Sequence, residues 1–124
     1  MNEVSVNSER DAYAISLLRS YYAAMNCHDI SRVIEFLDDN VYVTFPEEER
    51  NWRGRDRAIE KFGTMFEKLP SFVGDFDVEA TELSDTHTLL HVDCSFSCKD
   101  SNYTNQRKMT YKIIGEKIVE ICHL

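Results

Sequence analysis

Three polar residues, Tyr21, Tyr111 and His123, occur where the sequence pattern directs side chains toward the protein interior. Tyr21 lies on the apolar stripe of a predicted helix, and the other two lie on the inward faces of two predicted strands. A histidine can transfer a proton near neutral pH, and a tyrosine hydroxyl can stabilise an oxyanion. Together they could support isomerisation, dehydration or cyclisation of an apolar carbonyl compound. We therefore take Tyr21 and His123 as the candidate catalytic residues.

Each candidate also has a structural interpretation. A tyrosine in an aromatic stripe often packs in the core, with its hydroxyl bonded to one partner. His123 is the second-to-last residue and could be solvated. Arg107 is expected at the rim of any pocket that these residues share.

The residues expected to surround these groups are mainly apolar and aromatic, as in most small-molecule sites. They come from the first and third predicted helices and from the inward positions of the strands. The expected ligand-binding residues are Leu17, Val43, Phe45, Trp52, Phe62, Phe66, Cys94, Phe96, Met109 and Tyr111.

We expect neither a metal site nor a cofactor. The four cysteines contain no CxxC pair, and Cys94 and Cys98 are four residues apart on one predicted strand. A strand separates such positions by roughly 13 Å, too far for a disulfide or for shared ligation of a metal. The histidines and carboxylates lack metal-ligand spacing, and the four glycines form no phosphate-binding loop.

The composition predicts one domain covering residues 1–124, with 1–7 flexible. The formal net charge of −8 disfavours binding to nucleic acid or to an anionic membrane as the main role. No apolar run of about 18 residues is present, and the first residues lack the apolar core of a signal peptide. We expect a cytoplasmic protein, or one that also enters the nucleus.

Three helices are predicted in the first half of the chain. Ser8 is a candidate N-cap for a helix over 9–26, and Asp29 for a second helix over 30–37. A strand over 41–45 stops at Pro46. A third helix follows Gly54 and ends at Pro70.

A run of three glutamates at 47–49 is followed by four arginines, at 50, 53, 55 and 57. Such a charge reversal could bind a charged ligand, but it is more typical of a solvated hairpin. Trp52 lies inside this run and is expected to pack inward.

After Ser71 the apolar residues alternate with a period of two, which predicts an antiparallel meander of four long strands. Helices followed by strands predict an α+β domain of two layers, with three N-terminal helices packed on a curved antiparallel sheet. Long strands twist and curl, so we expect a pocket between the helices and the sheet. The outer sheet face is mixed, and Leu89, His91, Ile114 and Ile118 suggest a homodimer contact there.

The segments YYAAMNCHDISRVIEFLDDNVYVTFP and WRGRDRAIEKF resemble the nuclear transport factor 2-like superfamily, most closely its SnoaL-like and ketosteroid isomerase-like members. The shared marks are Asn26 and Asp29 in the turn after the first helix, the acidic pair at 38–39, and Arg53-Gly54 before the third helix. The resemblance covers about 8–124. It implies a cone-shaped fold with a deep apolar pocket and a dimer formed through the sheet.

The isomerase site is only partly matched. Tyr21 corresponds to the oxyanion-binding tyrosine, but Phe45 stands where the resemblance places the aspartate base, and Met109 where it places a second acid. Proton shuttling of that kind needs a carboxylate. Ketosteroid isomerase activity is therefore not expected. A scytalone dehydratase-like reaction is also disfavoured, because the expected tyrosine–aspartate pair falls on Met25-Asn26.

Three functions remain open at this point. The first is binding of a small apolar molecule, with or without cofactor-independent isomerase or lyase activity. The second is a non-enzymatic protein-binding module like nuclear transport factor 2 itself. The third is a dimerisation domain whose pocket is filled by Trp52, Phe66 and other side chains.

Overall fold

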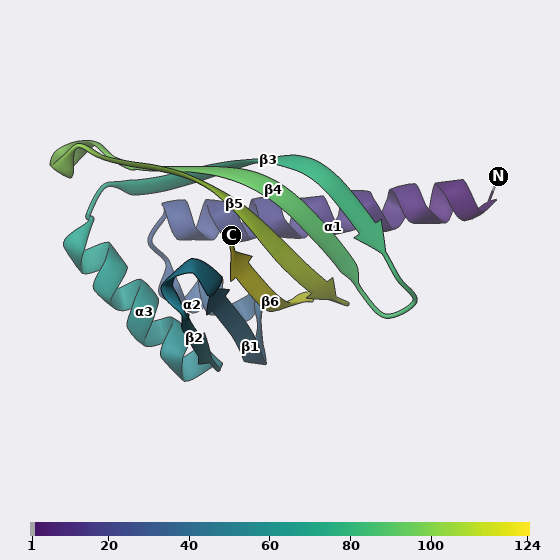
Figure 1. Cartoon of the computed structure of the whole chain (residues 1–124), viewed down its shortest axis with the longest axis horizontal. Coiled ribbons are helices and arrows are strands. Elements are labelled where there is room, and N and C mark those ends of the chain that lie inside the picture. Colours follow the sequence, from purple (N-terminus) through teal and green to yellow (C-terminus); the bar gives the residue numbers. More distant parts are fainter. Residues whose placement is uncertain (1) are drawn as a thin grey trace.

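The computed structural model describes residues 2–124, and their side chains from residue 9 onward. Three helices and six strands alternate with two short 3-10 turns (Figure 1). In chain order the elements are α1 (Asn2–Asn26), α2 (Ile30–Glu35), β1 (Leu37–Phe45), η1 (Pro46–Glu48), β2 (Arg50–Arg53), α3 (Arg55–Lys68), β3 (Phe72–Leu83), β4 (Thr88–Cys98), η2 (Lys99–Ser101), β5 (Tyr103–Ile114) and β6 (Lys117–His123).

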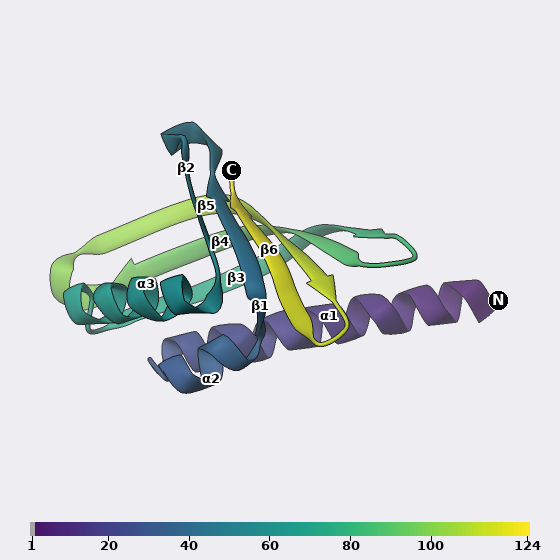
Figure 2. The same ribbon diagram turned by 90° about the horizontal axis from the view of Figure 1, so that it is seen from below.

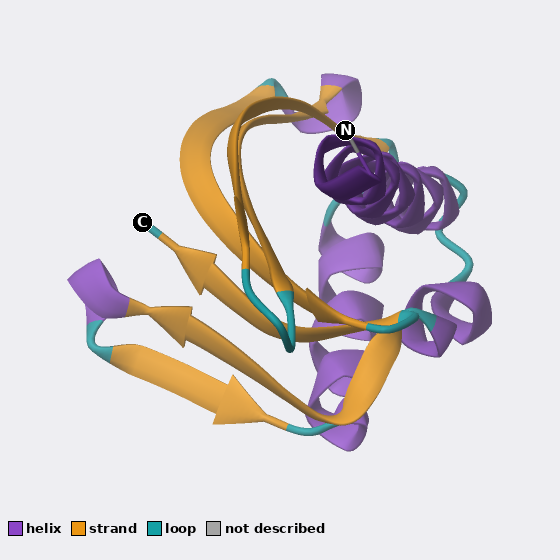
Figure 3. Cartoon of the chain, turned by 90° about the vertical axis from the view of Figure 1, so that its right-hand side faces the viewer, coloured by secondary structure: helices purple, strands orange, loops and turns teal. Residues whose placement is uncertain are grey.

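The helices lie on one side of a single curved sheet (Figure 2). Helix α1 packs against β3 and β4, and α3 packs against β1 and β2 at the other end of the sheet. The sheet is strongly curved, and its concave side faces α1 and α3 (Figure 3). The predicted α+β two-layer architecture with a curved sheet is therefore confirmed.

The sheet is mixed rather than antiparallel throughout, which corrects the prediction. Its strand order is β2-β1-β6-β5-β4-β3, and β1 pairs in parallel with β6. Val43 lies opposite Ile121 across this pair. Alternation along a strand reveals which residues share a face, but it says nothing about a partner strand far away in the sequence.

Two helix boundaries differ from the prediction. Helix α1 begins at Asn2, so Ser8 lies within it and is not its N-cap. Residues 2–7 form the first part of α1, and residue 1 lies outside the described part. The expected flexibility of 1–7 stays a prediction. Helix α2 ends at Glu35, and Leu37 already belongs to β1.

Two β-bulges explain where strict alternation fails. The register of β3 against β4 shifts between Val78 and Ala80. Phe76 and Ala80 would share a face in a regular strand, but Phe76 is buried and Ala80 is exposed. The pairing of β5 with β6 shifts next to Ile113, which lies opposite Ile118. Ile118 is 0% exposed, so it belongs to the core and not to the outer face as predicted. A bulge adds one residue to one strand and reverses the facing of those beyond it.

The turn between α1 and α2 fixes the direction of both helices. The Asn26 side chain donates to the Gly74 carbonyl at 2.9 Å and accepts from the Gly74 amide at 2.7 Å. Asp29 is the N-cap of α2, as predicted, and its carboxylate accepts from the Arg32 amide. These contacts attach the end of α1 to strand β3 and hold one wall of the interior in place.

Gly54 is the N-cap of α3, and it has a φ of 101°, a conformation that glycine adopts without steric cost. Its amide donates to the Val41 carbonyl at 2.8 Å. The next residue, Arg55, donates to the Leu37 carbonyl and forms an ion pair with Asp39 at 3.0 Å. The start of α3 is thereby tied to β1. Within the described residues, no helix is long and apolar enough to cross a membrane.

Candidate functional site

A pocket of about 300 Å³ lies between the concave face of the sheet and helices α1 and α3. Tyr21 and Met25 of α1 form one wall, and Phe62 and Met65 of α3 form another. The remaining walls come from β1, β2, β5 and β6, with Phe72 of β3 and Phe96 of β4. The parallel pairing of β1 with β6 brings residues that are far apart in the sequence into this wall.

The structure brings most of the sequence-predicted residues to this one pocket. Both candidate catalytic residues, Tyr21 and His123, line it. The ligand-binding candidates that line it are Val43, Phe45, Trp52, Phe62, Phe96, Met109 and Tyr111.

Three of the predicted ligand-binding residues lie elsewhere. Leu17 lines a separate surface depression with Phe36. The Phe66 ring stacks on His28 with centroids 4.3 Å apart. Cys94 is buried, and its sulfur lies 3.1 Å from the Tyr22 hydroxyl oxygen. All three are on inward faces as expected, but periodicity does not show how far along an element the pocket extends.

Tyr21 is the centre of an aromatic cluster at the inner end of the pocket. Its ring makes edge contacts with Tyr22, Phe36, Phe62 and Tyr111, at centroid distances of 5.8 to 6.4 Å. The residue is only 2% exposed, and its burial raises the pKa of the phenol well above the usual value. Within the described part of the chain its hydroxyl has no hydrogen-bond partner, so it can donate to a bound molecule.

Tyr111 also lines the pocket, but its hydroxyl is already engaged. It forms a hydrogen bond of 2.8 Å with the Tyr22 hydroxyl, which also contacts Cys94. Burial raises the pKa of both tyrosines and raises that of the Cys94 thiol to about 11, so all three groups stay neutral. This buried chain connects α1 to β4 and β5 and holds the neighbouring Tyr21 ring.

His123 lies on β6 with its ring stacked on Phe45, at 4.0 Å between centroids. Burial, followed by the positive charge of Arg107, lowers the pKa of His123 to about 4. The ring is therefore neutral at physiological pH, and its Nδ1 atom is buried without a hydrogen-bond partner in the described residues. His123 is the final residue of β6, which is paired with β1 on one side and with β5 on the other.

Basic and polar residues outside the predicted catalytic and ligand-binding sets also line the pocket. Arg50 of β2, Lys61 of α3 and Arg107 of β5 all reach it, together with Tyr103 and Asn105 of β5. Only Arg107 was expected, at the rim. Arg50 had been noted within the charge-reversal run, which gave a signal for it, but Lys61 lies at an exposed helix position that sequence alone does not distinguish.

The lining residues in the described part of the chain include no aspartate or glutamate. Phe45 occupies the position where the isomerases were expected to carry their base. The free Tyr21 hydroxyl and the neutral His123 ring are then the groups that can polarise a carbonyl oxygen and accept a proton from a neighbouring carbon.

The lowered pKa of His123 gives a direct test by nuclear magnetic resonance. The His123 ring should titrate near 4 in the folded protein and near 6.5 in the urea-unfolded chain. Stability from the neutral ring is complete above about 6.5 and is lost as the pH falls through about 4. Arg107→Gln should raise the folded value, because it removes a neighbouring positive charge. A folded midpoint near 6.5 would contradict the burial described here.

Comparison with known proteins places this chain in a family. The sequence profile of the SnoaL-like domain matches residues 18–121. No relative was found among curated proteins. A domain of unknown function with a cystatin-like fold from Nostoc punctiforme superposes with a TM-score of 0.77 at 11% identity, covering 93% of this chain and 76% of the other.

Two further solved structures share the fold. An NTF-2 like protein of unknown function from Shewanella oneidensis is 12% identical, with a TM-score of 0.77 and coverage of 91% of this chain and 97% of that one. A hypothetical protein with a ketosteroid isomerase-like fold from Catenulispora acidiphila, in complex with trimethylamine, is 9% identical, with a TM-score of 0.62 and coverage of 87% and 83%. The shared fold agrees with the resemblance to nuclear transport factor 2-like proteins, and the profile match shows that the chain belongs to the SnoaL-like domain family.

Proposed function

We propose that this protein binds a small, largely apolar molecule in the pocket between the sheet and helices α1 and α3. The observation that carries the proposal is the pocket itself, about 300 Å³ in volume and lined mainly by apolar and aromatic side chains. A concave apolar site with a few polar groups is the usual form of a small-molecule site. Trp52 lines the pocket without filling it, and Phe66 packs on His28 instead.

The Catenulispora protein supports the idea that this fold can hold a small organic molecule. Its ligand, trimethylamine, is a cation at neutral pH. In this chain it would meet the positively charged side chains of Arg50, Lys61 and Arg107. We therefore expect a different ligand here.

The uncharged fluorescent dye N-phenylnaphthylamine provides the binding test. Wild type should increase the dye's fluorescence on binding, and Met65→Trp should abolish most of this increase, because Met65 lines the pocket and an indole there would occupy it. Thr64→Trp adds the same group at an exposed position of α3 and should leave binding intact. Dye binding that survives Met65→Trp in a folded protein would place the dye elsewhere and contradict the proposal.

We further propose that the pocket promotes removal of a proton next to a carbonyl group, the step common to isomerisation, dehydration and cyclisation of carbonyl compounds. In this scheme Tyr21 donates a hydrogen bond to the carbonyl oxygen as it gains negative charge. The neutral His123 ring accepts the proton from the adjacent carbon and returns it later, so no cofactor is required.

Exchange of deuterium into the ketone β-tetralone, followed by nuclear magnetic resonance in heavy water, tests this chemistry. Wild type should accelerate exchange, and Tyr21→Phe or His123→Gln should lower the enzyme-dependent rate about a hundredfold. Tyr13→Phe removes a hydroxyl from an exposed position of the same helix and serves as control. Equal rates in wild type and Tyr21→Phe would leave the protein as a binding module without this activity.

We also propose that two copies of the chain form a dimer through their outer sheet faces. Thr44, Cys122, Thr110 and His91 form a row across four neighbouring strands. Ion pairs flank the row, and the Lys112–Glu120 pair is one of them. A centre of modest polarity with a charged border is compatible with an interface.

Native mass spectrometry tests this assembly. We expect a species of twice the 14.5 kDa chain mass, and conversion to single chains by Thr110→Arg, which puts a charge at the centre of the row. A wild-type protein that remains a single chain at micromolar concentration would exclude this interface, and with it the dimerisation role.

A further inference from the structure

We propose that the ligand of this pocket carries a negatively charged group, such as a carboxylate, that Arg107 and Lys61 bind at the mouth while its hydrocarbon body occupies the interior. This inference rests on the proposed binding function and specifies its ligand class. It would make the protein a receptor for, or an enzyme acting on, an amphipathic organic anion.

The charge of the pocket is opposite to that of the whole chain. The protein has 22 acidic and 14 basic residues, and a formal net charge of −8. Nevertheless three basic side chains line the pocket and, among the described residues, no acidic ones do. They come from three different elements, since Arg50 is on β2, Lys61 on α3 and Arg107 on β5. Their convergence therefore results from the fold and not from a basic stretch of sequence.

The basic side chains differ in whether a partner already neutralises them. Arg50 forms an ion pair with Glu48 at 2.6 Å, and its guanidinium lies 4.5 Å from the centre of the Phe45 ring. Arg107 and Lys61 take part in no ion pair and no side-chain hydrogen bond within residues 9–124. These two charges are consequently available to an anion from outside the chain.

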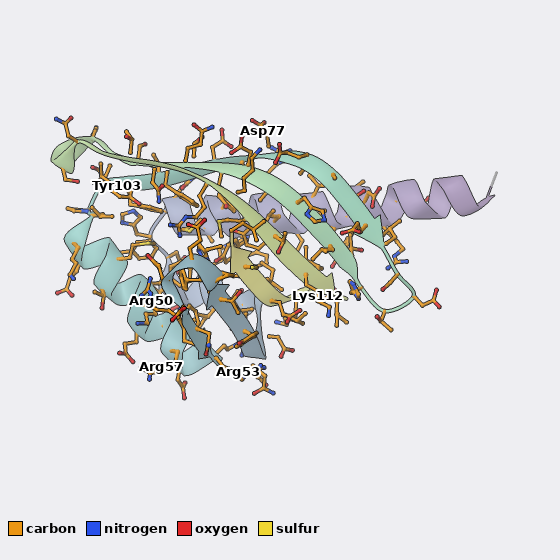
Figure 4. The ribbon with its side chains drawn as sticks, in the orientation of Figure 1. Arg50, Arg53, Arg57, Asp77, Tyr103 and Lys112 are labelled. Carbon is orange, nitrogen blue, oxygen red and sulfur yellow. The ribbon has the colours of Figure 1, made fainter. Side chains whose placement is uncertain are left out.

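Other arginines nearby show the contrasting arrangement. Arg55 pairs with Asp39 at 3.0 Å, and Arg57 approaches Glu60 at 3.6 Å. Arg50 and Arg57 are labelled in Figure 4, where Arg50 belongs to the start of β2 and Arg57 to the first turn of α3. Arg53, which does not line the pocket either, donates to the Asn40 carbonyl at 3.3 Å, and its guanidinium lies 4.3 Å from the centre of the Tyr42 ring. Within residues 9–124, Arg107 has neither a carboxylate partner nor a side-chain hydrogen bond.

The environment of Arg107 would strengthen an ionic contact. The side chain is partly buried, and its positive charge already acts on His123 by lowering the pKa of the ring. Charges interact more strongly at such a site than in water, because less solvent screens them. Asn105, whose amide donates to the Tyr103 hydroxyl at 3.2 Å, adds a polar group on the same strand. An arginine can hold a carboxylate by two parallel hydrogen bonds.

The test compares two dyes with the same aromatic skeleton. Anilinonaphthalenesulfonate carries a sulfonate, and N-phenylnaphthylamine has no charge. Trp52 is the only tryptophan of the chain and lines the pocket, so a dye bound there should receive energy from Trp52, and loss of dye fluorescence in Met65→Trp assigns the binding to the pocket. Arg107→Gln should weaken binding of the sulfonate dye about tenfold, with a smaller loss for Lys61→Gln, and both should leave the uncharged dye within about twofold.

Arg57→Gln provides the matched control, because it removes an arginine that does not line the pocket and should change neither affinity. Lys61 is exposed on α3, so Lys61→Gln keeps the test informative even if Arg107→Gln fails to fold. Added salt should weaken wild-type binding of the sulfonate dye but not of the uncharged dye.

Two results would overturn the inference in distinguishable ways. If the sulfonate dye binds equally well to wild type and to both pocket variants while the uncharged dye also binds, the pocket function stands and the anionic ligand class is wrong. If neither dye receives energy from Trp52, the binding function itself fails, and the ligand class fails with it.

Discussion

The structure depends on the parallel pairing of β1 with β6, the strands that follow the first two helices and end the chain. This pairing places Val43 and Phe45 beside Ile121 and His123 in one wall. Without it, the hairpin of β1 and β2 would have no sheet to extend, and α3 would have no sheet end to cover. The pocket is thus a long-range feature, and it can form only when Leu37–Phe45 and Lys117–His123, which are far apart in the sequence, have paired. Proteins with many such contacts are expected to fold slowly.

The pocket contains two kinds of polar group, which differ in how deeply they are buried. At the inner end, burial keeps the tyrosines neutral, and Tyr22 and Tyr111 satisfy each other by a hydrogen bond. Toward the mouth, the basic side chains of Arg50, Lys61 and Arg107 retain access to solvent. Burial and the positive charge of Arg107 both lower the pKa of His123. A molecule that matches this arrangement of buried and solvent-accessible groups has an apolar body, and a carbonyl group on that body would contact Tyr21.

Local patterns predicted the elements well, because they depend on neighbours in the sequence. The Asp29 cap of α2, helix α3 after Gly54 and the inward face of β4 required only spacing and residue type. The parallel strand pair and the bulge that buries Ile118 depend on contacts between distant segments, and they were missed. The same distinction applies to the site. Helical periodicity placed Tyr21 on an inward face and strand alternation placed His123 on one, whereas Lys61 resembles any solvated helix residue until α3 is placed over the pocket.

The two hydrogen bonds between Asn26 and Gly74 have a consequence for the behaviour of many copies of this protein together. Strand β3 is an edge of the sheet, and an open edge can add a strand from another molecule. The Asn26 amide uses the outward backbone groups of Gly74, so it occupies the place that an incoming strand would need. Asp75 and Asp77 add exposed negative charge along the same edge. The residue that orients α1 thereby also blocks the addition of a foreign strand at this point of the β3 edge.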